Sequence, residues 1–400
     1  MFQDDLHLST VTAVLPNSTV RRVVDGVLQE PGANAFVWTA RGTLLHDHWY
    51  KRWVPPISPV KTVLQMIVPD HEVDRVVGTV VERGRLNLQA TGAVFSTPSE
   101  RVYLGSEYQG WPAKQALAQD RDHGLSDSLS IIYCIVSHNI SDRVARAAVN
   151  AGAHGPIVYY SEGRGLRDRL GWLRITKEHE KEVLMVLADD TDVEDVFDAM
   201  AKAGELHLPG RGFMYRFSID KGMFNLPSRV SHHHYAANMQ QIINAIDHLA
   251  GHNHWRDQSV SDVGGEGRSV GLDFLQQPNA VPEEQVCVAA AVCRDQMQAL
   301  VDLLLDAGAP GLNFTYARRS SPDEGEQLAG AKISQEYAMV RCIVSAALAE
   351  RIGAELEDSA EAMGVRDLIV QLHAVQRIAT YVPGTIDYRQ QESDAQVNVA

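Results

Sequence analysis

Short apolar runs and amphipathic stretches follow one another in a fixed order in the middle of this chain. Apolar runs rich in Ile and Val, and one alternating run, predict strands at 129–137, 155–160, 182–188 and 213–220. Apolar residues at helical spacing, each stretch followed or ended by Gly, predict helices at 141–152 and 192–204. The order is therefore strand, helix, strand, strand, helix, strand. This order is typical of a ferredoxin-like α+β unit, an antiparallel sheet with both helices on one face.

The same order is predicted before and after this middle part. In the first part, strands are expected at 10–16, 35–40, 60–68 and 93–98, and helices at 17–32 and 70–84. In the last part, strands are expected at 285–292, 312–318, 336–345 and 368–382, and helices at 295–308 and 348–364. The bare face of each sheet is apolar and must be covered. Three copies in one chain can cover one another around a pseudo-threefold axis.

A glycine and leucine motif repeats at a constant offset of 120 residues. The shared positions are Gly84, Leu86, Leu88 and Gly92 in the first part and Gly204, Leu206, Leu208 and Gly212 in the second. In the third part, Gly364 stands in the place of Gly204. This period is too long for a solenoid unit and indicates whole domains in tandem. We therefore predict three tandem ferredoxin-like (βαββαβ) domains that form an intrachain pseudo-trimer, at 1–110, 125–226 and 283–386, with a helix and Gly-rich linker at 227–282.

Composition narrows the class of partner and the compartment. The chain has 400 residues, 45% of them hydrophobic and 22% charged, which is typical of a soluble globular protein. A net charge of −15 argues against a nucleic-acid partner. No apolar run approaches the roughly 20 residues that span a bilayer, and the first ten residues lack the features of a signal peptide. We expect a cytoplasmic protein that does not itself span a membrane.

Glycine and arginine gather in two segments of the middle part. The first, after the second predicted strand, holds Gly163, Arg164, Gly165, Arg167 and Arg169. The second, before the last predicted strand, holds Gly204, Gly210, Arg211 and Gly212. Gly-rich turns let backbone N–H groups face an anion, and the guanidinium forks of arginine match phosphate oxygens. These segments predict a phosphate-binding site; the alternative interpretation is a tight turn beside solvated arginines.

At these residues the chain resembles the PII signalling family. PII subunits are single ferredoxin-like domains that form trimers and bind adenine nucleotides in the clefts between subunits. Each cleft uses the base of a long loop after the second strand, the T-loop, and a Gly-rich turn before the last strand, the B-loop. Residues 162–172 occupy the T-loop position and 203–213 the B-loop position. The GRG sequence at the loop base and Glu180-Lys181-Glu182 before the third strand are similar to a divergent PII-like branch.

The resemblance is strong in the second copy, fair in the first and weak in the third. It implies that ATP, ADP or AMP binds as an effector at the glycines and arginines named above, with Gly84 and Gly92 as counterparts in the first copy. The first copy has Thr91 in place of Arg211, and the third retains only Gly364. One or two competent clefts are therefore expected.

The resemblance also implies a non-enzymatic regulator. Its partners would be a small anionic effector and a regulated protein, either a membrane transporter or an enzyme of nitrogen or carbon metabolism. The tyrosine-bearing T-loop stretch that some PII proteins have modified is absent, so covalent regulation of that type is not expected. No GxSxG, HExxH or Walker-type motif occurs in the sequence. The pseudo-trimer would be self-contained, alone or further dimerised.

Two histidine-containing segments suggest alternatives. The linker holds His232, His233, His234, His248, His252 and His254. His248 and His252 have the spacing of a metal-binding helix face, but Gly251 ends the predicted helix at 238–251 before His252, so no metal is expected. The segment at 45–53 carries His46, Asp47 and His48 beside three aromatic residues, which favours a contact surface over a ligand site. The alternative functions are a ligand-free assembly module on the same fold and a metal-binding protein that uses the His-rich linker.

Overall fold

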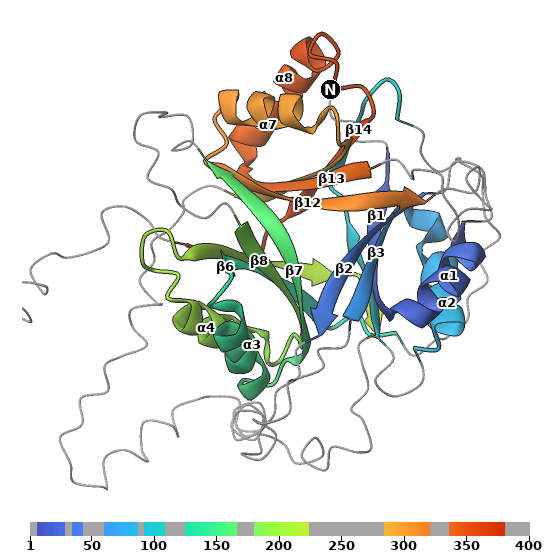
Figure 1. The fold of residues 1–400 in the computed structure, drawn as a ribbon, viewed down its shortest axis with the longest axis vertical. Helices are drawn as coiled ribbons and strands as arrows, with labels where there is room; N and C mark the ends of the chain where they lie inside the picture. Colours follow the sequence, from blue (N-terminus) through green and yellow to red (C-terminus); the bar gives the residue numbers. More distant parts are fainter. Residues whose placement is uncertain are drawn as a thin grey trace, which may run out of the picture.

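The computed structural model describes residues 6–28, 34–42, 60–86, 92–108, 125–165, 180–223, 284–320 and 336–380. These residues form a mixed α/β structure with six α-helices and one large antiparallel sheet of 15 strands (Figure 1). The helices lie on the outside and the strands face one another in the interior. Among the described residues, no helix has the length and the apolar character that crossing a membrane requires.

Three consecutive parts of the chain, called here the first, second and third segments, carry the elements in the predicted order. The first segment (6–108) contains β1 (Leu8–Pro16), α1 (Asn17–Val27), β2 (Ala35–Gly42), β3 (Val60–Pro69), η2 (Asp70–Glu72), α2 (Val73–Gly84), β4 (Ala93–Pro98) and β5 (Arg101–Leu104). The second (125–223) contains β6 (Leu129–Ser137), α3 (Ser141–Asn150), β7 (His154–Gly165), β8 (Glu180–Asp189), α4 (Val193–Gly204), β9 (Gly212–Ile219) and β10 (Lys221–Met223). The third (284–380) contains β11 (Gln285–Cys293), α7 (Met297–Asp306), β12 (Gly311–Ser320), β13 (Glu336–Ser345), α8 (Ala346–Ser359), β14 (Leu368–Ala374) and β15 (Arg377–Thr380).

The predicted strands and helices within the described residues are confirmed, with differences at four places. Strand β7 extends to Gly165, so that Gly163, Arg164 and Gly165, predicted at the base of a loop, lie in a strand. Helix α8 ends at Ser359, five residues before the predicted end. The expected last strand at 368–382 is divided into β14 and β15, which pair with different neighbours. The short strands β5 and β10 were not predicted. The predicted helix at 238–251, the histidines of the linker and the segment at 45–53 lie outside the described residues.

Strand β8 shows why its sequence is apolar on both faces. Val183, Met185 and Leu187 point into a cluster at the centre of the molecule. The alternate residues Leu184 and Val186, with Ala188, pack under α3 and α4. Successive side chains of a strand point to opposite faces, so a strand buried on both sides reads as a continuous apolar run. Strand β11 divides its residues between the central cluster and the helices α7 and α8 in the same way.

Each segment places its strands in the same spatial order. The order is β4-β1-β3-β2 in the first segment, β9-β6-β8-β7 in the second and β14-β11-β13-β12 in the third, with every pair antiparallel. The strands at one end of each series, β2, β7 and β12, also pair with one another. The three sheets therefore meet in a closed triangle, with a pair of helices behind each (Figure 1).

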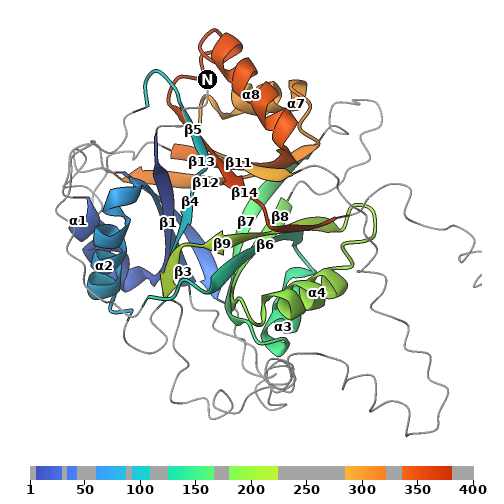
Figure 2. The same ribbon diagram turned by 180° about the vertical axis from the view of Figure 1, so that it is seen from behind.

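The last strand of each segment leaves its own sheet and completes that of another segment. Strand β5 pairs with β14 of the third segment, β10 with β4 of the first, and β15 with β9 of the second (Figure 2). An unpaired sheet edge exposes N–H and C=O groups that must find partners. The exchange supplies those partners and closes the cycle of three segments.

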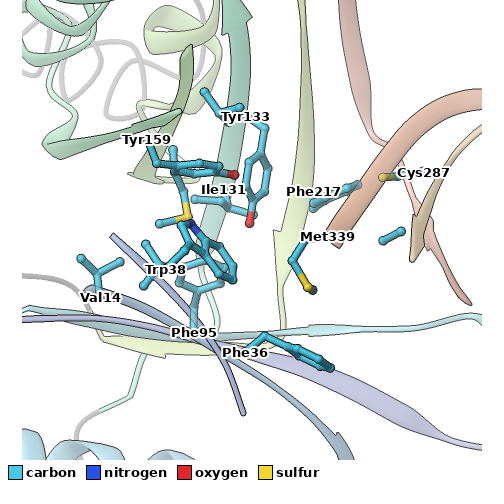
Figure 3. Close-up of a cluster of buried hydrophobic side chains, with 14 of the residues drawn as sticks. Val14, Phe36, Trp38, Phe95, Ile131, Tyr133, Tyr159, Phe217, Cys287 and Met339 are labelled. Carbon is cyan, nitrogen blue, oxygen red and sulfur yellow. The ribbon is translucent and has the colours of Figure 1, made fainter. Parts of the chain in front are cut away.

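The inner faces of the three sheets enclose what we call the central cluster. Its members from the first segment include Val14, Phe36, Trp38 and Phe95; from the second, Ile131, Tyr133, Tyr159 and Phe217; and from the third, Cys287 and Met339 (Figure 3). Three further clusters lie between each sheet and its own helices. The central cluster is therefore the part of the core that joins the segments to one another.

His373 of β14 links the stability of this arrangement to pH. Its side chain is buried, and Nδ1 lies 2.8 Å from the carbonyl oxygen of Pro98. Burial lowers the pKa of His373 from 6.5 to about 4, and the charge of Arg341 acts in the same direction against the opposing bond to Pro98. Because the folded-state pKa is depressed, the neutral ring contributes stability above about pH 6.5, and this is lost as the pH falls through about 4. The difference corresponds to about 3 kcal/mol.

We expect the free energy of unfolding to fall by about 3 kcal/mol more between pH 7 and pH 4 in the wild type than in His373→Gln. Glutamine retains a donor for Pro98 and does not titrate. Urea unfolding across this pH range measures both curves. Parallel curves for the two proteins would mean that His373 does not carry this part of the acid sensitivity.

Candidate functional site

A cavity of about 570 Å³ lies at the junction of the second and third segments. From the second segment it is lined by the end of β7 (163–165) and the turn that leads into β9 (209–210 and 212–214). From the third segment it is lined by the start of β12 (311–313) and by β15 (378–380). We call this the junction cavity.

Two ladders position the walls of the junction cavity. Strand β7 pairs with β12, so that Gly163 lies opposite Asn313 and Gly165 opposite Gly311. Strand β15 pairs with β9, with Thr380 opposite Phe213. Both ladders join the two segments directly. The cavity is therefore formed by the pairing of the segments and belongs to neither segment alone.

The charge of the junction cavity is positive among the described residues. Its ionisable lining side chains are Arg164 and Lys181, and no Asp, Glu, His or Cys is among the described lining residues. The Lys181 ammonium donates to Ser137 Oγ at 3.1 Å, and Arg164 makes no ion pair with a described residue. Apolar side chains of Phe213 and Ile378 form part of the wall. A ligand with an anionic group and an apolar ring suits such a lining.

Asn313 adds a fixed polar group to this wall. Its Nδ2 donates to Ser161 Oγ at 3.3 Å, and Ser161 Oγ donates to the carbonyl oxygen of Phe314 at 3.0 Å. The Oδ1 atom of Asn313 is buried and has no hydrogen-bond partner among the described residues. A buried acceptor without a donor is unfavourable by about 1–3 kcal/mol. A ligand N–H group in the junction cavity would remove this penalty.

Five of the residues predicted from the sequence line the junction cavity. They are Gly163, Arg164, Gly165, Gly210 and Gly212. Arg167 and Arg169 lie outside the described residues. The sequence analysis did not predict Lys181, Asn313 or the residues of β15 as part of the site. For Lys181 a signal was available, because Lys61 precedes it by 120 residues, the same offset as in the glycine motif.

Arg211 lies on the other side of the turn. Its guanidinium is 2.9 Å from Glu205, which is also 3.3 Å from Arg143. Arg211 lines a second, shallower depression with Ser137 and Asn139. Arg211, which the sequence predicted to bind phosphate, is thus paired with a carboxylate of the same turn. Arg164 instead lines the junction cavity.

The remaining predicted glycines, Gly84, Gly92 and Gly204, do not line the junction cavity. Gly92 and Gly212 both have positive φ values, 156° and 142°. A Cβ atom at either one would lie 2.0 Å from a carbonyl oxygen of the first strand of its segment, Val14 or Ile135. Gly84 and Gly204 end helices against Leu86 and Leu206. The repeated motif therefore reflects close packing of the turn in both segments, in addition to any contact with a ligand.

The junction of the third and first segments is filled by side chains of the chain itself. By strand register, Arg319, Tyr337 and Asp367 correspond to Gly163, Lys181 and Arg211. Arg319 donates to the Tyr337 hydroxyl at 2.6 Å, the Tyr337 hydroxyl donates to Asp367, and Arg319 lies 3.7 Å from Asp367. Burial raises the pKa of Asp367, with Tyr337 and Arg319 opposing it. At this junction the arginine lies beside a carboxylate of its own segment, whereas Arg164 at the junction cavity makes no ion pair with a described residue.

The junction of the first and second segments carries a buried carboxylate. Glu182 accepts from Arg41 at 3.2 Å and from the Ser141 hydroxyl, and it lies 3.0 Å from His138. Arg41 also bonds Asp142 at 2.9 Å. Burial acts to lower the pKa of Arg41, but the hydrogen bonds and charges of Asp142 and Glu182 have a larger effect in the opposite direction. The pKa of Arg41 is therefore raised. This network ties β2 of the first segment to the second.

Metal binding finds no support within the described part of the chain. No group of three or more His, Cys, Asp or Glu side chains is placed there to hold a metal ion. All four cysteines are buried and free. The histidines of the linker cannot be placed, since that segment lies outside the described ranges.

Comparisons with known proteins leave the family open. No family model matches the chain, and no curated protein is similar to it in sequence. An unknown protein from Galdieria sulphuraria is 10% identical with a TM-score of 0.16, over 54% of this chain and 98% of its own. A microcompartment protein from Desulfitobacterium hafniense is 11% identical with a TM-score of 0.14, over 66% and 98%. A mutant chlorite dismutase from Candidatus Nitrospira defluvii is 11% identical with a TM-score of 0.16, over 63% and 93%. Scores this low assign the chain to no family.

Proposed function

We propose that the protein is a non-enzymatic, PII-like regulator that binds an adenine nucleotide in the junction cavity and acts on a target protein. Three tandem ferredoxin-like domains would form an intrachain pseudo-trimer. The observation that carries the proposal is the junction cavity itself. It lies between two segments, beside the end of a second strand and the turn before a last strand, and its described ionisable side chains are cations.

The common strand order of the three segments supports the repeat. Each segment pairs its first strand with its third and fourth, and its third with its second. The exchange of last strands runs around the same cycle. A βαββαβ unit that occurs three times with one pattern of pairing is most simply a tandem triplication.

The chemistry of the wall supports an adenine nucleotide as the effector. Arg164, Lys181 and the backbone N–H groups of the glycine turn at 209–212 would bind phosphate oxygens. The apolar residues Phe213 and Ile378 would cover one face of the base. The unpartnered Oδ1 of Asn313 would accept from an exocyclic amino group. Adenine has such an amino group, and hypoxanthine has a carbonyl oxygen in its place.

Regulation would follow from the position of the cavity in the chain. Residues 166–179 follow directly after Gly165, which lines the cavity. A nucleotide that contacts 163–165 would bind directly beside this segment, and in the proposal it alters the contact of the protein with its target. By resemblance to PII proteins, the target is a membrane transporter or an enzyme of nitrogen or carbon metabolism.

We expect one adenine nucleotide to raise the melting temperature by a few degrees in a panel of ATP, ADP, AMP, cyclic AMP and the inosine counterparts, with and without magnesium. Arg164→Ala should abolish the shift, whereas Arg211→Ala, whose guanidinium is held by Glu205, should retain most of it. Inosine nucleotides should bind at least tenfold more weakly, and Asn313→Leu should remove that preference. The protein should release no phosphate from ATP or ADP over hours, as expected for binding without hydrolysis.

A shift lost in Arg211→Ala but kept in Arg164→Ala would move the site to the depression beside Glu205. No shift with any nucleotide would favour the second candidate, a ligand-free assembly module. The specific observation that favours this candidate is the junction of the third and first segments, where the Tyr337 hydroxyl links Arg319 to Asp367.

A further inference from the structure

Arg341 of β13 brings a positive charge into the central cluster. The side chain is partly buried. Its Nη1 donates to the Tyr159 hydroxyl at 3.4 Å and its Nη2 to Gln65 Oε1 at 3.3 Å. The guanidinium carbon lies 4.5 Å from the centre of the Tyr133 ring. These contacts come from the first and second segments and Arg341 itself belongs to the third, so Arg341 lies where the three sheets meet.

Arg341 has no charged counterpart in the other two segments. It lies opposite the fifth residue of β11, Ala289. The fifth residues of β1 and β6 lie opposite Gln65 and Met185. The corresponding positions are therefore occupied by Gln in the first segment, Met in the second and Arg in the third. In the first two segments an uncharged side chain occupies this position.

No carboxylate in the described part of the chain neutralises Arg341. None of the ion pairs between an arginine and a carboxylate among the described residues includes Arg341. The groups around Arg341 are an amide, phenols and a thiol. Burial tends to lower the pKa of Arg341, but Tyr133, Tyr159, Tyr215 and Cys287 raise it, and the sum is well above the ordinary value. Arg341 is therefore charged.

The neighbouring groups that could become anions stay neutral. Burial raises the pKa of Tyr133 and Tyr159 and raises that of Tyr215 well above its ordinary value, against the opposing charge of Arg341. Burial also raises the pKa of the Cys287 thiol to about 12. At neutral pH none of them supplies a negative charge. A charge held in the interior without a counter-ion is strongly unfavourable.

Two buried donors in the central cluster lack a hydrogen-bond partner among the described residues. One is the Tyr215 hydroxyl, which is fully buried, and the Tyr215 ring stacks on that of Tyr133 at 5.4 Å between centres. The other is the Trp38 Nε1, and the Trp38 ring lies 5.7 Å from that of Tyr159. Figure 3 shows Trp38, Tyr133 and Tyr159 together at the centre of the cluster. The central cluster therefore contains two donors without acceptors and the cation of Arg341 without a carboxylate, and one acceptor that carries negative charge could serve all three.

We propose that a small monovalent anion, such as a halide, nitrate or formate, binds to Arg341 in the central cluster. The anion would accept from the guanidinium and from the Tyr215 hydroxyl and Trp38 Nε1. A monovalent ion neutralises the single charge of Arg341. Since the three sheets all contribute groups, binding would stabilise the closed arrangement of the segments.

The test is a bromide titration of the full-length protein, refolded at constant ionic strength with gluconate as the replacement anion. Gluconate has the same charge and is too large for a packed core. We expect the melting temperature to rise on a saturating curve by about 3 °C. Arg341→Met should lose the dependence on bromide. Arg318→Met removes an exposed arginine of β12 that makes no described ion pair, and it should behave as the wild type.

Tyr215→Phe provides a second variant, because its hydroxyl has no described hydrogen-bond partner whose loss would disturb folding. It should raise the bromide midpoint about tenfold. Crystals grown in bromide should show an anomalous peak beside Arg341. Equal melting curves in bromide and gluconate, or a bromide dependence that survives in both Arg341→Met and Tyr215→Phe, would overturn the proposal.

Discussion

Replacing Gly212 with alanine is expected to destabilise the protein by on the order of 4 kcal/mol. The glycine has φ 142°, and a Cβ atom there would lie 2.0 Å from the Ile135 carbonyl oxygen. The obstacle is backbone of a central strand, so it cannot move aside as a flexible side chain could. Both the strained φ and the overlap act against folding. Urea unfolding of the purified variant measures the loss.

Gly364→Ala is the matched control for this prediction. Gly364 also has a positive φ, 79°, but nothing lies within 4 Å of its added Cβ. The substitution should therefore cost only the left-handed backbone term of about 1 kcal/mol. If the two variants lost similar stability, the close approach of the turn to β6 would not be the reason for the glycine.

Glu182→Ala is expected to destabilise the protein by about 3–4 kcal/mol. The carboxylate is buried, with its side chain 1% exposed, and accepts from Arg41 and Ser141. Its removal leaves the Arg41 guanidinium with fewer acceptors, opens a cavity and loosens the junction of the first and second segments. The change should appear as a lower urea midpoint.

Asp142→Ala removes the other carboxylate bound to the same guanidinium. Asp142 is 2.9 Å from Arg41, but its side chain is 73% exposed. Solvent-exposed ion pairs contribute less than about 1 kcal/mol. A loss in Asp142→Ala as large as in Glu182→Ala would show that burial is not what makes Glu182 important.

Periodicity was sufficient to predict most elements of the fold. Helix α4 buries Val193, Val196, Phe197 and Met200 on one face, and strands such as β8 are apolar throughout because both faces are covered. These are local signals, since the residues that create them lie within one turn or one strand of each other. The positions of α4 and β8 therefore follow from the sequence within one or two residues.

The exchange of strands could not be predicted in the same way, nor could β5 and β10 or the division between β14 and β15. Strands β5, β10 and β15 have 4, 3 and 4 residues. Segments this short carry no usable alternation. Each becomes a strand because an edge of another segment's sheet lies beside it. Pairing between distant parts of the chain decides these elements, and local propensity does not.

The candidate site was predictable from one side only. The glycines and Arg164 of the second segment stand out in the sequence and do line the junction cavity. Asn313 and β15 come from the third segment, and their approach depends on how the segments pair. The recurrence of Gly92 and Gly212 suggested an anion site, yet the overlap with Val14 and Ile135 is a sufficient reason for both. A repeated glycine can thus mark backbone packing as readily as a ligand.

The exchange of last strands within one chain has a consequence for how such an assembly behaves on dilution. A ring of three separate subunits comes apart when its concentration falls, because association is governed by mass action. Here the partners of β5, β10 and β15 are tethered to them, at an effective concentration that dilution does not change. A single chain also allows each junction to differ in sequence from the others. One substitution alters one junction here, whereas in a homotrimer the same substitution would alter all three. A ring with a cavity at one junction and an arginine beside a carboxylate at another has an asymmetry that three identical subunits cannot encode.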